Sequence, residues 1–205
     1  MKTTSRRRPA EIDVHPLTPE RWNDLVALFT GPGSRQVRWC WCMYYRRSGR
    51  ANVPAGTSYG DYNREALKSL VDAGTVPGLI GYRDGQPIAW VSLGPRDDYA
   101  KLARSPVMKP VDEKPVWSVI CFYTAPNARG EHVSEAMLAR AADYARDNGA
   151  TLLEAYPVDA SARKSDDSMW FGAKGFYDRA GFREVARRKP TRPVMRKALR
   201  SRTTR

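Results

Sequence analysis

The chain has 205 residues and a mass of 23.1 kDa, which suits one domain with a substantial buried core. An apolar share of 41% excludes wholesale disorder, and three cysteines exclude a disulfide-stapled miniprotein. No secretory signal opens the sequence, and no apolar run approaches the roughly 20 residues of a membrane span. We therefore expect a reduced, cytoplasmic protein with no membrane partner.

The net charge of +13 is concentrated at the two ends of the chain. Residues 1–10 contribute +4 and residues 183–205 contribute +9, so the residues between them are balanced. Proteins that bind phosphate backbones usually spread their excess charge over a folded face. The distribution favours solubility as the role of the basic ends and leaves contact with nucleic acid open. We expect a basic flexible arm over 1–10, one domain over 11–200 and a basic tail over 201–205.

The first half of the chain alternates strand and helix signals. Thr18-Pro19-Glu20 is a typical helix start, and the Asp84-Gly85 pair is a hairpin signal. The expected elements are a strand at 11–17, a helix from 18 to 30, a helix at 61–73, strands at 77–82 and 87–93, and a helical excursion at 97–104. Between the first two helices lies the densest aromatic cluster of the chain, residues 39–46.

The second half reads as strand, helix, strand. Residues 116–124 are almost continuously apolar or aromatic, as in a strand covered on both faces. A turn at 125–130 leads into a helix at 131–148, and further expected elements are a strand at 151–156, a helix at 167–180, and strands at 182–187 and 194–199. The order predicts an α/β fold, a mixed sheet with helices on both faces.

The turn before the long helix is a candidate anion site. A helix N-terminus presents unpaired N–H groups and a partial positive charge, which favour phosphate. Gly130 lets the backbone approach a ligand closely, and Arg129 adds charge at the same place. An ordinary strand-to-helix turn with a surface arginine fits the same residues.

Three segments together resemble the GCN5-related N-acetyltransferase (GNAT) superfamily over roughly residues 11–200. The first, CFYTAPNARGEHVSEAML at 121–138, is similar to the family's acetyl-CoA motif. The others are LLEAY at 152–156 and FYDRAGFREV at 176–185, which resembles the family's Tyr-x-x-x-Gly-Phe ending. His132 and Ser134 stand where the motif has glycine, and Trp170 stands where many members have asparagine.

The resemblance implies a mostly antiparallel central sheet, with the strands at 116–124 and 151–156 splayed at the cofactor site. It implies acetyl-CoA as co-substrate, with no metal. The backbone of Phe122, Tyr123 and Thr124 would pair with the pantetheine arm. The backbone N–H groups of the following turn would hold the pyrophosphate: Arg129, Gly130, Glu131, His132, Val133 and Ser134.

The resemblance also points to two catalytic candidates. Tyr177 matches a family position often used as the acid that protonates the departing thiolate, and a packed helix tyrosine is the equal alternative. Glu154 is the best-placed carboxylate for a base, followed by Asp159. A strand-end carboxylate paired with an arginine fits Glu154 at least as well, and the family often works by positioning alone.

The cysteines carry weaker signals. Cys121 is read as a buried strand residue in preference to a covalent nucleophile, since no basic neighbour is evident. Cys40-x-Cys42 has the wrong spacing for a usual zinc site. The aromatic residues around this pair are expected to form core or a substrate wall.

The sequence therefore predicts an N-acetyltransferase that transfers an acetyl group from acetyl-CoA to an amine by direct attack on the thioester. A small-molecule acceptor is favoured over a peptide. The alternatives are a nucleic-acid-associated protein and a non-catalytic acyl-CoA sensor on the same fold. A homodimer is left open.

Overall fold

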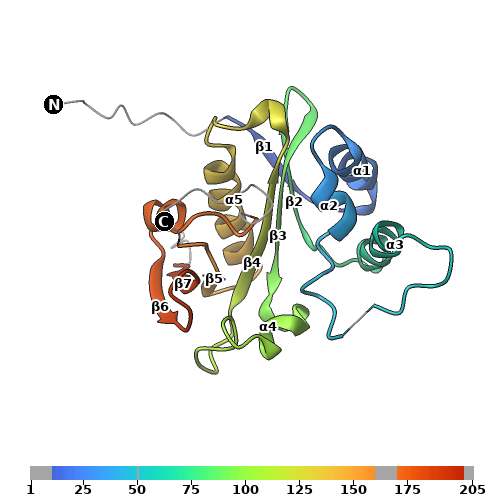
Figure 1. Cartoon of the computed structure of the whole chain (residues 1–205). Coiled ribbons are helices and arrows are strands. Elements are labelled where there is room, and N and C mark those ends of the chain that lie inside the picture. The colour runs from blue at the N-terminus through green and yellow to red at the C-terminus, as the bar shows by residue number, and fades with distance from the viewer. Residues whose placement is uncertain (1–10, 50, 160–169, 201–205) are drawn as a thin grey trace.

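A computed structural model of the chain describes residues 11–49, 51–159 and 170–200. Within these residues seven strands form one sheet with helices on both faces (Figure 1). The expected arm at 1–10, the tail at 201–205 and the start of the helix expected at 167–180 lie outside the described residues. None of the described helices combines the length and the apolar character needed to cross a membrane.

The strands follow the spatial order β1-β2-β3-β4-β5-β7-β6. β4 and β5 pair in parallel, and every other neighbouring pair of this sheet is antiparallel. The expectation of a mixed, mostly antiparallel sheet is confirmed. The strand bounds are β1 (Asp13–Pro16), β2 (Gly78–Arg83), β3 (Gln86–Pro95), β4 (Trp117–Thr124), β5 (Leu152–Ala155), β6 (Arg183–Arg187) and β7 (Pro193–Ala198).

Helices cover the two faces unequally. The bounds are α1 (Trp22–Thr30), α2 (Arg35–Cys40), α3 (Tyr59–Asp72), α4 (Ala100–Arg104), α5 (Val133–Asp147) and α6 (Lys174–Arg179), with 3₁₀ turns η1 (Pro19–Arg21), η2 (Arg96–Asp98) and η3 (Pro126–Ala128). α1, α2 and α3 lie to one side of the central strands, and α5 crosses the other side (Figure 1). The sequence did not predict α2, because its six residues bury Val37 alone and carry no helical period.

The α5 face is packed with small side chains. Met137 and Ala141 are fully buried, as the helical spacing predicted, whereas Tyr144 is half-buried against Trp117. Gly81 permits this close approach, because a Cβ there would lie 2.6 Å from the Met137 sulfur. The helix can therefore lie directly on the sheet.

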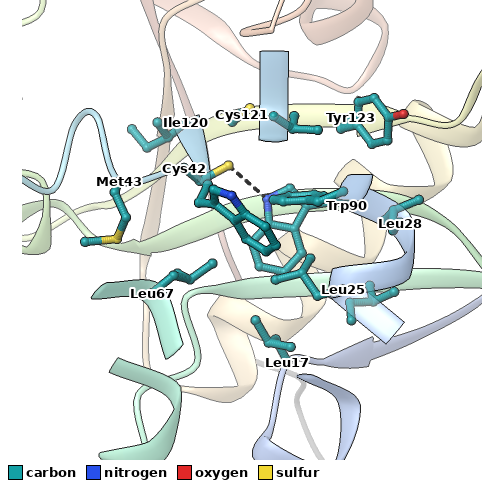
Figure 2. Packing of buried hydrophobic residues seen from close by; sticks show 14 of the residues in the cluster. Leu17, Leu25, Leu28, Cys42, Met43, Leu67, Trp90, Ile120, Cys121 and Tyr123 are labelled. Atoms are coloured by element: carbon teal, nitrogen blue, oxygen red, sulfur yellow. Dashed lines mark hydrogen bonds between the residues drawn. The ribbon is translucent and has the colours of Figure 1, made fainter. Parts of the chain in front are cut away.

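The opposite face is aromatic. Trp90 of β3 is fully buried there, and its ring meets Phe29 of α1 edge-on at 5.8 Å between centroids. Leu17, Leu25 and Leu67 surround this indole (Figure 2). The Trp90 indole N–H donates to the Cys42 sulfur at 3.2 Å, so even this polar atom is satisfied within the core.

β4 and β5 separate after a short contact. Their pairing covers three positions and ends at Val119 and Ala155, while β4 continues to Thr124. The β3–β4 register also shifts between Ser92 and Leu93, so that Ile120 is an extra residue in β4. Such a bulge bends the strand and increases its twist. The far end of β4 is thereby left without a β5 neighbour, as the expected splay requires.

The gap between the separating strands β4 and β5 is called the wedge. A buried ion cluster lies at its narrow end, where the two strands still pair. The Glu154 carboxylate is fully buried and accepts from Arg96 at 2.5 Å, from Arg196 at 2.7 Å and from the Tyr156 hydroxyl at 2.6 Å. Tyr156 also contacts the Ser118 hydroxyl of β4 at 2.9 Å. Since every strong donor here faces an acceptor, the cluster joins η2, β4, β5 and β7 without an orphaned charge on Glu154.

We expect Glu154→Gln to lower the free energy of unfolding by roughly 3–5 kcal/mol, because it leaves two guanidinium groups without their shared carboxylate. Urea unfolding measures this loss. Glu184→Gln is the matched control, since Glu184 forms an exposed pair with Arg187 and should cost less than about 1 kcal/mol. Equal losses in the two variants would contradict the proposed role of the cluster.

Candidate active site

A cavity of about 680 Å³ opens where β4 runs free of β5. This volume is in the range of pockets that hold cofactors and small molecules. Its walls are the α2 segment and the loop after it, the second half of β4, the start of α5, and residues from Trp170 to Arg179. The lining residues are Gly33, Arg35, Gln36, Val37, Trp39, Cys40, Cys42, Tyr44, Tyr45, Ile120, Cys121, Phe122, Tyr123, Thr124, Ala128, Arg129, Gly130, His132, Val133, Ser134, Glu135, Trp170, Gly172, Ala173, Phe176 and Arg179.

One end of the cavity is formed by the N-terminus of α5. N–H groups of a first helical turn have no partner inside the helix and point outward. Gly130 has φ +80° with open space where a Cβ would lie, so the backbone is accessible there. Arg129 donates from Nε to the Thr124 carbonyl at 3.2 Å, which holds its side chain beside the same turn. The arrangement can bind an anionic group.

The N-cap residue of α5 is His132, with φ +60°. This left-handed region favours glycine, which is the residue that the resembled motif carries here. Histidine is among the side chains that tolerate it best. Its ring nitrogen Nδ1 lies 3.3 Å from a Glu135 oxygen, so the side chain turns along the helix and leaves the backbone of the turn open.

Of the residues expected to hold a cofactor, eight line the cavity and Glu131 does not. The Glu131 carboxylate pairs with Arg83 at 2.5 Å, away from the cavity walls. The expectation for Glu131 concerned its backbone N–H, and this stays a prediction.

The free edge of β4 carries a contact that the sequence did not reveal. The Phe122 N–H donates to the Trp170 carbonyl at 2.8 Å. Ala125 donates to the Ile88 carbonyl of β3, and since alternate residues of a strand point the same way, the Tyr123 N–H also faces β3. By the same alternation the N–H groups of Phe122 and Thr124 face the wedge, and the pairing of this strand with a pantetheine arm stays a prediction.

Charge on the α5 side of the cavity is balanced by a local pair. Arg179 of α6 donates to the Glu135 carboxylate at 2.6 Å. Burial raises the pKa of Glu135, but hydrogen bonds from Arg179 and His132 outweigh it, so the pKa lies below its usual value. Glu135 is thus ionised at neutral pH and is paired with Arg179.

The aromatic cluster of residues 39–46 divides between the cavity and the core. Trp39 is 53% exposed and stacks on Tyr59 at 4.5 Å between centroids, on the rim. Tyr44 receives the Lys101 ammonium 3.5 Å from its ring centroid. Trp41, by contrast, is buried between Trp22 and Phe29. One short segment therefore contributes both to the core and to the cavity lining, and its role as a substrate wall stays a prediction.

Tyr177 lies behind the cavity wall and not in it. Its side chain is fully buried, and its hydroxyl donates to the Phe171 carbonyl at 2.8 Å. Burial raises the pKa of this phenol well above its usual value. A Cβ on Gly172, which lines the cavity, would lie 3.4 Å from the Tyr177 ring. The ring thus supports the wall directly, and its catalytic role stays a prediction.

The carboxylates proposed as bases are also outside the lining. Glu154 is enclosed by its two arginines, and Asp159 pairs with Arg187 at 2.8 Å. Among the described residues, no group of three or more His, Cys, Asp or Glu side chains could hold a metal ion.

A family model described as the Acetyltransferase (GNAT) family matches residues 37–182. A comparison with curated proteins gives no match. Among solved structures, the PaiA N-acetyltransferase from Thermoplasma acidophilum in complex with coenzyme A is 14% identical, with a TM-score of 0.51, covering 92% of this chain and 99% of its own.

Two further structures are similar in fold. The ribosomal-protein-alanine N-acetyltransferase from Brucella melitensis is 18% identical, with a TM-score of 0.51 and coverage of 91% of this chain and 99% of its own. A polyamine N-acetyltransferase from Drosophila melanogaster, which forms N-acetylagmatine, is 14% identical, with a TM-score of 0.50. The match covers 92% of this chain and 100% of the Drosophila chain.

The left-handed backbone at His132 makes a testable prediction. We expect His132→Val to lower the free energy of unfolding by roughly 1–2 kcal/mol, because a β-branched residue is strained at this φ. His132→Gly removes the strain and should leave stability unchanged or raise it by up to about 1 kcal/mol. Thermal unfolding compares the two, and equal stabilities would show that α5 does not begin in this conformation.

Proposed function

The chain belongs to the GNAT acetyltransferase family, and from this we propose that it transfers an acetyl group from acetyl-CoA to the amine of an acceptor. The observation that carries the proposal is the cavity itself, in which the free edge of β4 meets the N-terminus of α5. One wall can pair with an extended, amide-bearing chain, and the adjoining end can bind phosphate. Pantetheine and pyrophosphate have these two properties in this order.

The residues present fit acetyl-CoA. The open backbone at Gly130 and the first turn of α5 would hold the pyrophosphate, with Arg129 beside it. The N–H of Phe122 faces the wedge and would serve the pantetheine arm once the Trp170 carbonyl releases it. Bound acetyl-CoA supplies an acyl group activated as a thioester. The chain supplies orientation, since holding two reactants together can lower a barrier by several kcal/mol.

We propose that the acceptor enters along the aromatic wall formed by Trp39, Tyr44 and Tyr45. Aromatic faces bind organic amines through apolar contact and through attraction for cations. The proteins of similar fold act on acceptors as different as agmatine and the alanine of a ribosomal protein. A small-molecule amine is our preferred acceptor, with a peptide amine as the alternative.

Positioning is the proposed basis of rate enhancement. Tyr177 and Glu154 are both withdrawn from the cavity lining and satisfied by buried partners. Their contacts favour supporting roles: Tyr177 fixes the wall at Phe171 and Gly172, and Glu154 fixes the narrow end of the wedge. The acceptor must still lose a proton, and solvent entering the open cavity can accept it.

The cofactor assignment is tested by calorimetric titration of acetyl-CoA into the protein. We expect Arg129→Glu to weaken binding by at least about tenfold, because it replaces an attractive charge beside the pyrophosphate with a repulsive one. Arg140→Glu on the exposed side of α5 is the matched control, since it makes the same charge change away from the cavity. ATP and desulfo-CoA separate nucleotide binding from recognition of the thiol end.

Equal weakening in the two variants would mean that net charge, and not the turn at Arg129, governs binding. No binding by the unaltered protein would overturn the acetyl-CoA assignment itself.

Tyr177→Phe separates a supporting role from a catalytic one. The variant leaves the buried Phe171 carbonyl without its donor, so we expect a loss of about 1–3 kcal/mol in stability. With a supporting role, kcat should change by only a few-fold at temperatures where the variant is folded. A fall in kcat of about 100-fold or more, with stability and acetyl-CoA affinity intact, would instead identify Tyr177 as the acid.

A further inference from the structure

The cavity is lined by more cationic than acidic side chains. Its charged residues are Arg35, Arg129, Arg179 and Glu135, with the imidazole of His132 beside them. Among the described residues of the lining, Glu135 is the one carboxylate, and Arg179 holds it at 2.6 Å. The described lining therefore keeps no acidic group in reserve for a positively charged ligand.

The aromatic wall adds a cation of its own. The Lys101 ammonium of α4 lies 3.5 Å from the centroid of the Tyr44 ring, and the Lys101 backbone N–H donates to the Tyr45 carbonyl at 3.1 Å. This places an ammonium group on a ring that lines the cavity. The attraction of the Tyr44 ring for a cation is thus already used within the chain.

No described carboxylate compensates the charge of Lys101. Burial lowers the pKa of Lys101, and the charge of Arg47 adds to this effect, whereas an acidic neighbour would raise that pKa. Arg47 itself lies 4.2 Å from the Tyr62 ring centroid, and its Nε and Nη2 atoms are buried without a hydrogen-bond partner in the described parts of the chain. Since buried polar groups are normally paired, the positive charge here is unusual.

Arg192 brings a further cation close to Tyr45. Its guanidinium lies 5.1 Å from the centroid of the Phe171 ring, which meets the Tyr45 ring edge-on at 5.3 Å. Nη1 of Arg192 donates to the Tyr156 carbonyl at 3.2 Å, which fixes the group without neutralising its charge. Burial lowers the pKa of Arg192, and no described carboxylate opposes this effect.

We propose that the amine acceptor carries a carboxylate, as a free amino acid does, and that Lys101 and Arg192 supply the positive charge that binds it beside Tyr44 and Tyr45. The inference rests on the proposed acetyl transfer and names the acceptor class for it. Cations without acidic partners can form the strong hydrogen bonds that a carboxylate accepts. A polyamine would bring further positive charge, which the same cations repel.

The same charges favour the reactive form of the acceptor. A neutral amine is needed to attack a thioester carbonyl, and nearby cations lower the pKa of an amine because they disfavour its ammonium form. In the transfer, the N–C bond forms and the C–S bond breaks, and the proton that the nitrogen loses ends on the thiol of coenzyme A, directly or through solvent. The carboxylate is unchanged by the reaction and serves to bind.

The experiment measures release of coenzyme A from acetyl-CoA by the full chain, with a panel of the common free amino acids. Each accepted amino acid is compared with the amine that lacks only its carboxylate, such as phenethylamine for phenylalanine or agmatine for arginine. We expect kcat/KM to be at least about tenfold higher for the amino acid. Preference for the decarboxylated amines or for spermidine would overturn the proposal, as would no turnover of any amino acid by a protein that binds acetyl-CoA.

Substitutions test the residues assigned to the carboxylate. We expect Lys101→Glu to lower kcat/KM for the amino acid at least about tenfold and to leave its decarboxylated counterpart unchanged or improved. Lys109→Glu is the matched control, since Lys109 is exposed and lies outside the cavity lining, and it should change neither value. Arg192→Gln should reduce the same preference. An equal loss with both acceptors would indicate a structural role and overturn the assignment.

Calorimetric titration of acetyl-CoA separates the two levels of the proposal. We expect both variants to bind acetyl-CoA as the unaltered protein does, and thermal unfolding checks that they are folded at the assay temperature. No binding by the unaltered protein would overturn the transfer reaction and this inference with it. Binding and turnover without a preference for carboxylates would overturn this inference alone.

Discussion

The separation of β4 from β5 is the constraint on which the rest of the structure depends. A sheet normally pairs its strands along their length, because unpaired N–H and C=O groups in the interior are costly. Here the pairing stops at Val119 and Ala155, and the bulge at Ile120 turns β4 away. The exposed edge must be satisfied by something else. In this structure the Trp170 carbonyl does so at Phe122.

Rigid surroundings keep this gap open in a fixed shape. On one face α5 lies close to the sheet through small side chains, and its N-terminus is thereby delivered to the wide end of the wedge. On the other face the aromatic packing around Trp90 holds α1 and the loop after α2. At the narrow end of the wedge, the ion cluster at Glu154 holds the paired parts of the strands together through Arg96 and Arg196. The cavity thus results from three well-packed regions that meet around one unpaired strand edge.

Sequence reasoning predicted the elements that have a strong hydrophobic period or clear capping and turn residues at their ends. β4, α5 and their intervening turn were located to within a few residues, because a continuous apolar run and a helical stripe at Met137 and Ala141 are local features. α2 was missed because six residues with one buried side chain have no period. The roles of Tyr177 and Glu154 depended on which way each side chain faces and on partners 6 to 58 residues away. Motif spacing holds no such information.

The Glu154 cluster also bears on how the chain folds. Arg96, Asp112, Glu154 and Arg196 come from four segments spread over half of the chain, and Arg196 bridges Glu154 and Asp112. Contacts between such distant segments require several loops to close first, and loop closure is slow and entropically costly. Burying the Glu154 carboxylate does not stabilise the fold until Arg96 and Arg196 are both in place to pair with it. The cluster should therefore assemble late, after the β2–β3 hairpin and the β4–α5 unit. Interactions absent from the transition state act mainly on the unfolding rate, so this cluster governs how long the native state lasts once it has formed.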